Sequence, residues 1–179
     1  MRYFNILRLY LQVFFCYDGY RKMTILGIDP GIARLGFGLV VKKAGRVNSL
    51  LYGCMETSKD EDEEQRLRIL FEKTSRLIKK YKPEAVVLEK IFFSQNVKTA
   101  LTVGQARGVV MLSGAMFNLP IFSYTPLEVK LAITGYGRAD KKQIQKMIQS
   151  ILNLKKLPQP DDAADALGIA VTHCFTHKL

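Results

Sequence analysis

The order of apolar segments along the chain constrains its fold more than any other feature. Three short apolar runs come first, and the second and third flank the turn-like stretch Lys43-Ala44-Gly45, which predicts an antiparallel hairpin. Later apolar runs alternate with longer helical segments, a pattern typical of parallel strands joined by crossover helices. The sequence therefore predicts an α/β fold with a mixed five-stranded sheet and helices on both faces.

Hydrophobic periodicity and turn residues give the boundaries of these segments. Strands are expected at residues 24–29, 35–43, 46–57, 84–90 and 120–125. Helices are expected at residues 61–80, 96–118, 126–133, 140–152 and 161–176. Asp140 is a suitable N-cap for the fourth helix, because its carboxylate can accept a hydrogen bond from a free backbone N–H.

The chain is expected to form one domain with a short extension before it. A length of 179 residues is enough for one sizeable core and too small for two. Residues 1–22 are apolar and aromatic, but polar residues interrupt the run and no signal-peptide cleavage site follows it. We therefore interpret residues 1–22 as an extension outside the fold and residues 23–179 as a single domain.

The charge balance favours a polyanionic partner. The chain carries 27 basic and 16 acidic residues, a net charge of +11, which suits nucleic acid but also fits a protein without that role. Its three cysteines are widely spaced and form neither a zinc motif nor a disulfide framework. These observations predict a cytoplasmic protein that does not enter a membrane.

Two carboxylates close buried strands. Asp29 ends the first predicted strand and Glu89 ends the fourth. Ligand sites in open α/β sheets lie at the carboxyl ends of strands, so two acids there indicate a site. Each residue taken alone has an equally good structural explanation, as a turn cap for Asp29 or as a partner of a nearby lysine for Glu89.

The last predicted helix begins with "PQPDDAADALGIAVTHC" and brings further carboxylates. Asp165 shares a helix face with Asp162, three residues before it, and also with Asp161, four residues before it, so spacing alone does not choose between them. The surrounding alanines favour close packing of this helix against the sheet. Acids from the helix would then meet Asp29 and Glu89, and a divalent cation such as Mg²⁺ would relieve their repulsion. Such a site in a basic chain predicts a metal-dependent nuclease.

Three sequence blocks resemble a known family. "ILGIDPGIARLGFG", "VVLEKIFFSQNVKTALTVGQARGVV" and "PQPDDAADALGIAVTHC" are similar to the three acidic blocks of the RuvC family of bacterial Holliday junction resolvases, over roughly Thr24 to His173. The resemblance implies a ribonuclease-H-like fold and a homodimer with two active sites. It also implies Mg²⁺-dependent, symmetric nicking of four-way junction DNA during recombination and repair, with RuvA and RuvB as partners.

The resemblance also assigns roles to residues. It places the catalytic, metal-binding acids at Asp29, Glu89, Asp162 and Asp165, and leaves Asp161 to the helix cap. Whether one or two Mg²⁺ ions bind, and whether Mn²⁺ replaces them, stays open.

The family's DNA-contacting residues are expected outside the acidic cluster. The resemblance places a junction-contacting aromatic at Phe92 and DNA-contacting or catalytic lysines at Lys130 and Lys141. Lys142 is a further candidate for DNA binding because it lies in the same basic stretch. Arg107, on a helix with Gly104 and Gly108, is a further candidate for DNA binding, and it could serve the core, the active site or a dimer interface.

Three other functions compete with junction cleavage. An RNA-processing nuclease of the same fold is one, and a non-catalytic protein that binds branched DNA is another. The stretch "GIDPGIARLGFG" also loosely resembles the phosphate loop of sugar kinases and chaperone ATPases, but those proteins need two such domains and this chain is too short.

Overall fold

The computed structural model describes residues 21–90 and 97–177, and in these ranges it contains five strands and five helices. The strands are β1 (Met23–Asp29), β2 (Arg34–Lys43), β3 (Arg46–Glu56), β4 (Ala85–Glu89) and β5 (Ile121–Tyr124). The helices are α2 (Glu63–Tyr81), α3 (Val97–Met116), α4 (Pro126–Thr134), α5 (Lys141–Ile151) and α6 (Asp161–Thr176). Each predicted element is present, with shifts of one or two residues at most ends.

The strands form one mixed five-stranded sheet, as the sequence predicts, and the structure gives their order as β3-β2-β1-β4-β5. β1 pairs antiparallel with β2, and β2 with β3. β1 pairs parallel with β4, and β4 with β5. The hairpin between β2 and β3 turns at Ala44 and Gly45, whose φ angles of 49° and 75° suit the right-handed twist of the two strands.

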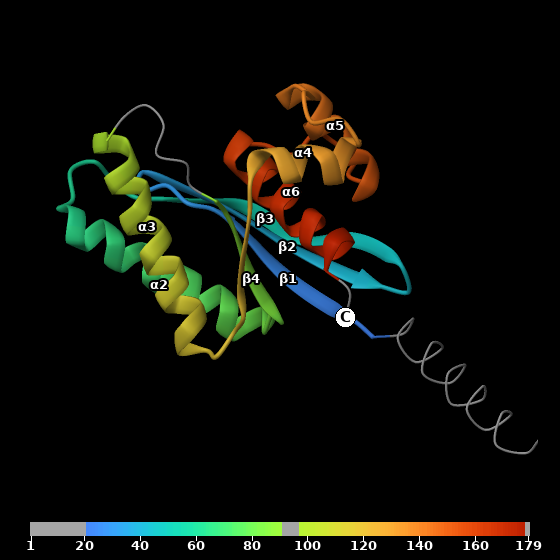
Figure 1. Cartoon of the computed structure of the whole chain (residues 1–179). Helices are drawn as coiled ribbons and strands as arrows, with labels where there is room; N and C mark the ends of the chain where they lie inside the picture. Colours follow the sequence, from blue (N-terminus) through green and yellow to red (C-terminus); the bar gives the residue numbers. More distant parts are fainter. Residues whose placement is uncertain (1–20, 91–96, 178–179) are drawn as a thin grey trace, which may run out of the picture.

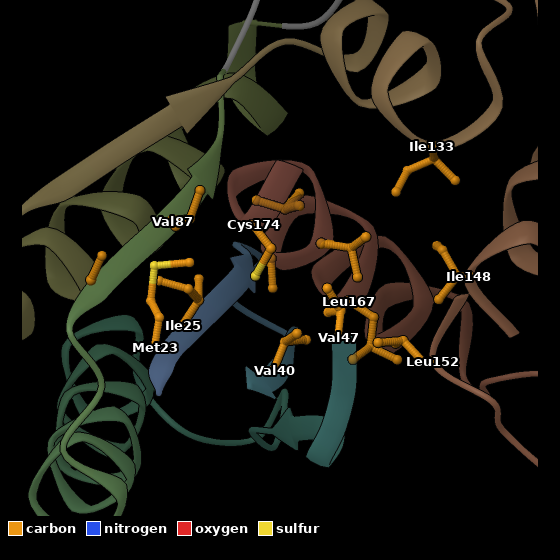
Figure 2. Close-up of a cluster of buried hydrophobic side chains, with 14 residues drawn as sticks. Met23, Ile25, Val40, Val47, Val87, Ile133, Ile148, Leu152, Leu167 and Cys174 are labelled. Carbon is orange, nitrogen blue, oxygen red and sulfur yellow. The ribbon is translucent and has the colours of Figure 1, made fainter. Parts of the chain in front are cut away.

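Helices cover both faces of the sheet (Figure 1). Because strand side chains alternate between faces, β1 directs Met23 and Ile25 to the side of α6 and Leu26 and Ile28 to the side of α2 and α3. The first core includes residues of α4, α5 and α6, several of which are drawn in Figure 2. The second core joins the sheet to α2 and α3. The predicted layers are therefore confirmed.

Helix α6 lies unusually close to the sheet because both surfaces have small residues. A Cβ atom built on Gly36 of β2 would collide with the backbone carbonyl oxygen of Asp162, and one on Gly27 of β1 would collide with that of Ala166. The side chains of Ala163 and Ala166 are fully buried in this contact region. The expectation drawn from the alanines is thus confirmed, and the glycines of the sheet are its other half.

Two of the predictions lie on residues that the structure does not describe. These are residues 1–20 of the expected extension and the DNA-contacting Phe92. Arg21 is described and forms an ion pair of 3.1 Å with Glu84, both on the surface, where such a pair adds little stability. Within the described ranges, no helix has the length and apolar character needed to cross a membrane.

Candidate active site

The two strand-end carboxylates lie at the same level on one face of the sheet. The parallel register of β1 and β4 pairs Ile28 with Leu88, so Asp29 and Glu89 follow on adjacent strands. Ile28 and Leu88 point to the face of the sheet that α2 and α3 cover. Asp29 and Glu89 are the next residues of the two strands, so their side chains point to the other face. Asp29 and Glu89 therefore face α6, as a shared site at the carboxyl ends of parallel strands requires.

The first two turns of α6 bring the helix carboxylates to this edge of the sheet. The backbone of Asp162 lies against Gly36, which pairs directly with Asp29 across β1 and β2. Asp165 is one turn further along and lines a cavity together with Glu89. The structure thus brings all four predicted acids to one end of the sheet.

The pKa values of these groups show how strongly the acids interact. Burial, together with repulsion from Glu89, Asp165 and Asp162, raises the pKa of Asp29 to about 7. Burial and the charge of Asp165 raise the pKa of Glu89, and burial likewise raises that of Asp165. At neutral pH the cluster therefore tends to hold a proton unless a cation compensates its charge.

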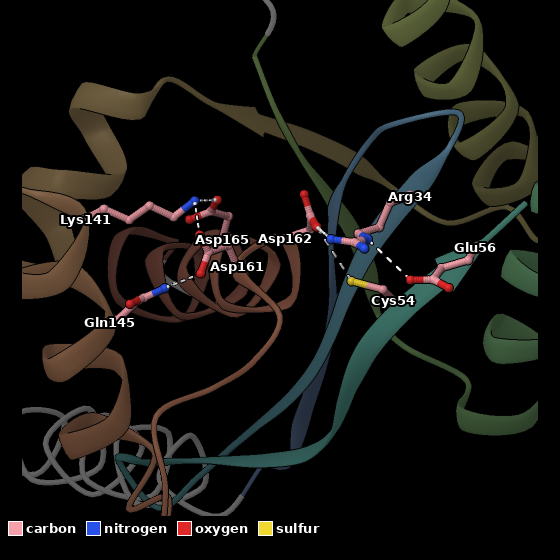
Figure 3. A network of polar contacts seen from close by, with 8 residues as sticks. All are labelled: Arg34, Cys54, Glu56, Lys141, Gln145, Asp161, Asp162 and Asp165. Atoms are coloured by element: carbon pink, nitrogen blue, oxygen red, sulfur yellow. Dashed lines mark hydrogen bonds and ion pairs between the residues drawn. The ribbon is translucent and has the colours of Figure 1, made fainter. Parts of the chain in front are cut away.

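Two basic side chains compensate part of that charge from opposite sides (Figure 3). Lys141, the first residue of α5, places its Nζ 3.1 Å from Oδ2 of Asp165. Arg34, the first residue of β2, places Nη1 3.5 Å from Oδ2 of Asp162 and Nε 3.4 Å from Oε1 of Glu56. The start of α5 is fixed by a capping box between Asp140 and Gln143, so the predicted N-cap is confirmed.

Asp161 does not cap α6, contrary to the prediction. The N-cap position is Pro160, and no side chain caps the helix. The carboxylate of Asp161 turns instead toward α5, where it accepts a hydrogen bond of 2.9 Å from Nε2 of Gln145 and lies 3.3 Å from Nζ of Lys141. A carboxylate in the first turn still interacts favourably with the helix dipole, so the residue type suits both positions.

The donor chemistry of the cluster fits a hard divalent cation. Carboxylate oxygens are the ligands that Mg²⁺ prefers, and burial together with repulsion from the neighbouring acids raises the pKa of Asp29, a penalty that a cation would reduce. In the described part of the chain, no group of three or more histidine, cysteine or carboxylate side chains is already convergent enough to hold a metal ion. Asp162 and Asp165 are instead turned toward Arg34 and Lys141.

A cavity of about 210 Å³ opens beside the acids. Glu89, Asp165, Lys130 and Lys141 give it charged groups, and its other walls are apolar side chains of α4, α5 and α6. Two of the predicted lysines thus lie next to two of the predicted acids. An anionic group entering this cavity would meet both ammonium groups.

The remaining candidates lie further away. Lys142 is exposed on the surface of α5. Arg107 lies on α3, on the opposite side of the sheet, where Nη2 donates to Oγ of Ser123 at 3.0 Å and Nη1 lies 3.1 Å from Sδ of Met111. Arg107 therefore links α3 to β5, and a DNA contact from it stays a prediction.

Comparison with known proteins identifies the chain's relatives. The family model "Crossover junction endodeoxyribonuclease RuvC" matches residues 25–173. The chain belongs to the RuvC family. RuvC of Brevibacillus brevis is 50% identical over 151 residues, which cover 84% of this chain and 91% of that protein. RuvC of Alkaliphilus oremlandii is 50% identical over 154 residues, covering 86% and 94% of the two chains.

Solved structures give the same relationship. The structure of Thermus thermophilus RuvC in complex with Holliday junction substrate is 38% identical, with a TM-score of 0.82, and the match covers 86% of this chain and 93% of that one. The yeast mitochondrial Holliday junction resolvase Ydc2, at 14% identity and a TM-score of 0.60, shares the fold. The predicted ribonuclease-H-like fold is therefore confirmed for this RuvC-family member.

Sequence reasoning missed several residues around the acids, among them Arg34, Glu56 and Gln145. Arg34 and Glu56 face each other across β2 and β3, a pairing that follows only from the hairpin register. Gln145 is four residues after Lys141 and so shares its helix face, a signal that the sequence did contain.

Proposed function

We propose that the chain is a crossover junction endodeoxyribonuclease that resolves four-way DNA junctions by paired, symmetric nicks during recombination and repair. The observation that carries this proposal is the meeting of Asp29, Glu89, Asp162 and Asp165 at one end of the sheet, in a RuvC-family chain with a net charge of +11. A basic surface attracts the phosphate backbone, whereas a cluster of acids would repel it. Such a cluster therefore favours catalysis over simple binding.

We infer that the four acids hold Mg²⁺, with one or two ions per site. A bound divalent cation would stabilise the charge that develops on the attacking and leaving oxygens of a phosphodiester. The chain's own contribution is to orient the acids on adjacent strands and on α6. Lys130 and Lys141 line the adjoining cavity and supply positive charge where a phosphate group would lie.

We also propose a homodimer, which would present two active sites to two strands of like polarity. An exposed apolar stripe on α3 supports this proposal. It consists of Leu101, Gly104, Gly108, Leu112 and Met116. These positions recur every three or four residues and so lie on one helix face. Apart from the helix's own nearby backbone, no described atom lies within 4 Å of a Cβ built on Gly104 or Gly108.

The dimer proposal has a direct test. Leu112→Glu adds a charge within the stripe at a residue that is 55% exposed, so the monomer fold should tolerate it. Sedimentation of the wild type is expected to give a dimer, and the variant is expected to shift toward monomer. A wild-type monomer at micromolar concentration would exclude the proposed dimer. RuvA and RuvB, as the partners that the family resemblance implies, are testable by co-sedimentation on the same junction.

Cleavage of a synthetic mobile four-way junction in Mg²⁺ tests the catalytic proposal. The wild type is expected to make paired nicks, while Asp29→Asn and Asp162→Asn should bind the junction without cutting. Glu72→Gln, which removes an exposed carboxylate with two arginine partners on α2, is the matched control and should cut normally.

Parallel reactions on duplex, single-stranded and RNA-containing substrates test the specificity. If linear duplex or RNA is cut as fast as the four-way junction, the proposed substrate is wrong. If the wild type binds the junction but does not cut it in any divalent metal, the nuclease proposal is wrong and the protein is a non-catalytic junction-binding protein.

A further inference from the structure

Lys141 is shared between two carboxylates of different kinds. Its Nζ lies 3.1 Å from Oδ2 of Asp165 and 3.3 Å from Oδ2 of Asp161. Asp165 belongs to the proposed metal-binding set, whereas Asp161 points away from it toward α5 (Figure 3). One ammonium group thus bridges an acid that a metal ion would occupy and an acid that stays outside the site.

The carboxylate of Asp161 is held in place for this contact. Gln145 donates from Nε2 to Oδ1 of Asp161 at 2.9 Å, which leaves Oδ2 for Lys141. Gln145 is only 8% exposed, so its amide has little freedom to turn away. Lys141 and Gln145 are four residues apart on one face of α5. Both contacts therefore connect the same side of α5 to the first residue of α6.

A cation on Asp165 would change the surroundings of Lys141. Oxygens of Asp165 engaged with a metal ion are poorer partners for an ammonium group, and the two positive charges repel each other. Without a second partner, Lys141 would swing into solvent, because a lysine side chain has four flexible bonds and a strongly hydrated end. Asp161 is the partner that remains.

We infer that Asp161 is a positioning residue that retains Lys141 beside the acidic cluster when a divalent cation takes over Asp165. This inference rests on the proposed nuclease site and adds to it a residue outside the set of four acids. Lys141 would move a short distance, from a position shared by two carboxylates to one held mainly by Asp161. It would thus stay at the cavity where a phosphate group is expected.

A plain surface ion pair would behave differently. Lys141 is 50% exposed and Asp161 55%, and exposed pairs of this kind contribute little to folding. Loss of Asp161 should therefore leave the melting temperature nearly unchanged. Its effect is expected in metal affinity and in the rate of nicking, both of which depend on where Lys141 lies.

The test compares Asp161→Asn with the wild type, with Lys141→Ala and with the double variant. Asparagine keeps an oxygen for Gln145 and removes the charge that Lys141 uses. Titration calorimetry with Mg²⁺ alone on the free protein measures metal affinity, and single-turnover nicking at saturating Mg²⁺ measures the rate. We expect Asp161→Asn to weaken Mg²⁺ binding and to slow nicking by about three- to fivefold, the upper part of the range for loss of one exposed ion pair. Junction binding in the presence of a chelator should not change, and Asp161→Glu should restore most of the loss.

The double variant decides the cause. If Asp161 acts through Lys141, adding Asp161→Asn to Lys141→Ala should change both measurements by less than about twofold. Equal losses in both backgrounds would mean that Asp161 acts only as a nearby negative charge, and a large fall in melting temperature would mean a structural role. Either result overturns the inference, as does an unchanged Mg²⁺ affinity.

The two proposals fail in different ways. Calorimetry needs no substrate, so it tests the role of Asp161 even if the wild type does not cut a four-way junction. Conversely, the wild type could make paired nicks while Asp161→Asn has the same rate and the same Mg²⁺ affinity. That result would support the nuclease proposal and reject the positioning role of Asp161. Glu72→Gln, which removes an exposed carboxylate with two cationic partners far from the site, controls for loss of charge.

Discussion

Replacement of Asp29 by asparagine is expected to stabilise the metal-free protein while it abolishes nicking. Asp29 is half-buried at the end of β1, and burial and the charges of Glu89, Asp165 and Asp162 raise its pKa from 3.8 to about 7. At pH 8 the folded protein must therefore carry an unfavourable negative charge at this position. Asparagine has nearly the same shape and no charge, so the variant avoids that penalty.

The size of the effect follows from the pKa shift. A rise from 3.8 to about 7 corresponds to roughly 4 kcal/mol between the protonated and ionised forms. Solvent around a half-buried group and rearrangement of its neighbours reduce this value, and we expect a gain of about 2 kcal/mol in the free energy of unfolding at pH 8. That gain is a large part of the stability of a domain of this size.

The pH dependence gives the sign of the effect. A carboxyl group with a raised folded-state pKa adds stability at low pH, and this contribution is lost as the pH rises through the folded pKa. For Asp29 the window lies between about pH 4 and pH 7. The advantage of Asp29→Asn should therefore be near zero below pH 4, grow through this window and stay constant above it.

Urea unfolding in the presence of a chelator, at pH 5 and at pH 8, measures the difference. Asp60→Asn, the same change at an exposed carboxylate in the turn before α2, is the matched control and should be neutral at both values. Added Mg²⁺ should stabilise the wild type more than Asp29→Asn, because only the wild type has the full set of ligands. A variant that is no more stable than the wild type at pH 8 would refute the argument that burial and the neighbouring acids disfavour the charge of Asp29.

Three further predictions come from neighbouring contacts. Gly36→Ala should destabilise the protein by more than about 2 kcal/mol in urea unfolding, because its Cβ would collide with the backbone of Asp162 and push α6 from the sheet. Arg34→Met should lower the Mg²⁺ concentration for half-maximal nicking by about two- to threefold, because Arg34 no longer competes for Asp162, and an unchanged or higher requirement would contradict this. His173 is buried and its pKa falls to about 4, so it should reduce stability by up to about 3 kcal/mol as the pH falls from 6.5 to 4. This loss of stability at low pH should be absent in His173→Gln. The difference between the wild type and this variant isolates the contribution of His173, because the opposite contribution of Asp29 is present in both proteins.

The fold was predictable because each element has a local signal. The hairpin follows from an apolar run on each side of Ala44 and Gly45, and α6 follows from acids before a run of small apolar residues. The mix of antiparallel and parallel pairing also followed, because a short turn joins antiparallel strands and a crossover helix joins parallel ones. The meeting of Asp29 and Glu89 needed only the rule that ligand sites lie at strand ends.

The polar partners of the site were not predictable in the same way. Arg34 is an exposed residue of β2 with no motif around it, and its partner Glu56 is on another strand. Asp161 was expected to cap α6, and it turns to α5 because Lys141 and Gln145 happen to present their side chains there. These contacts depend on how two elements pack against each other. The hydrophobic periodicity of each element predicts its buried face but not the distance between the two elements.

The close packing of α6 connects the fold of this protein to its proposed chemistry. Gly27, Gly36 and Gly38 of the sheet let the helix backbone approach, and the same approach brings Asp162 and Asp165 to the strand ends. A larger residue at any of these glycines would separate the acids and relieve their repulsion, and would also leave no site for a cation. The small residues of the sheet are therefore needed for the close contact with α6, and the burial and mutual repulsion that raise the pKa values of Asp29, Glu89 and Asp165 are its physical consequence.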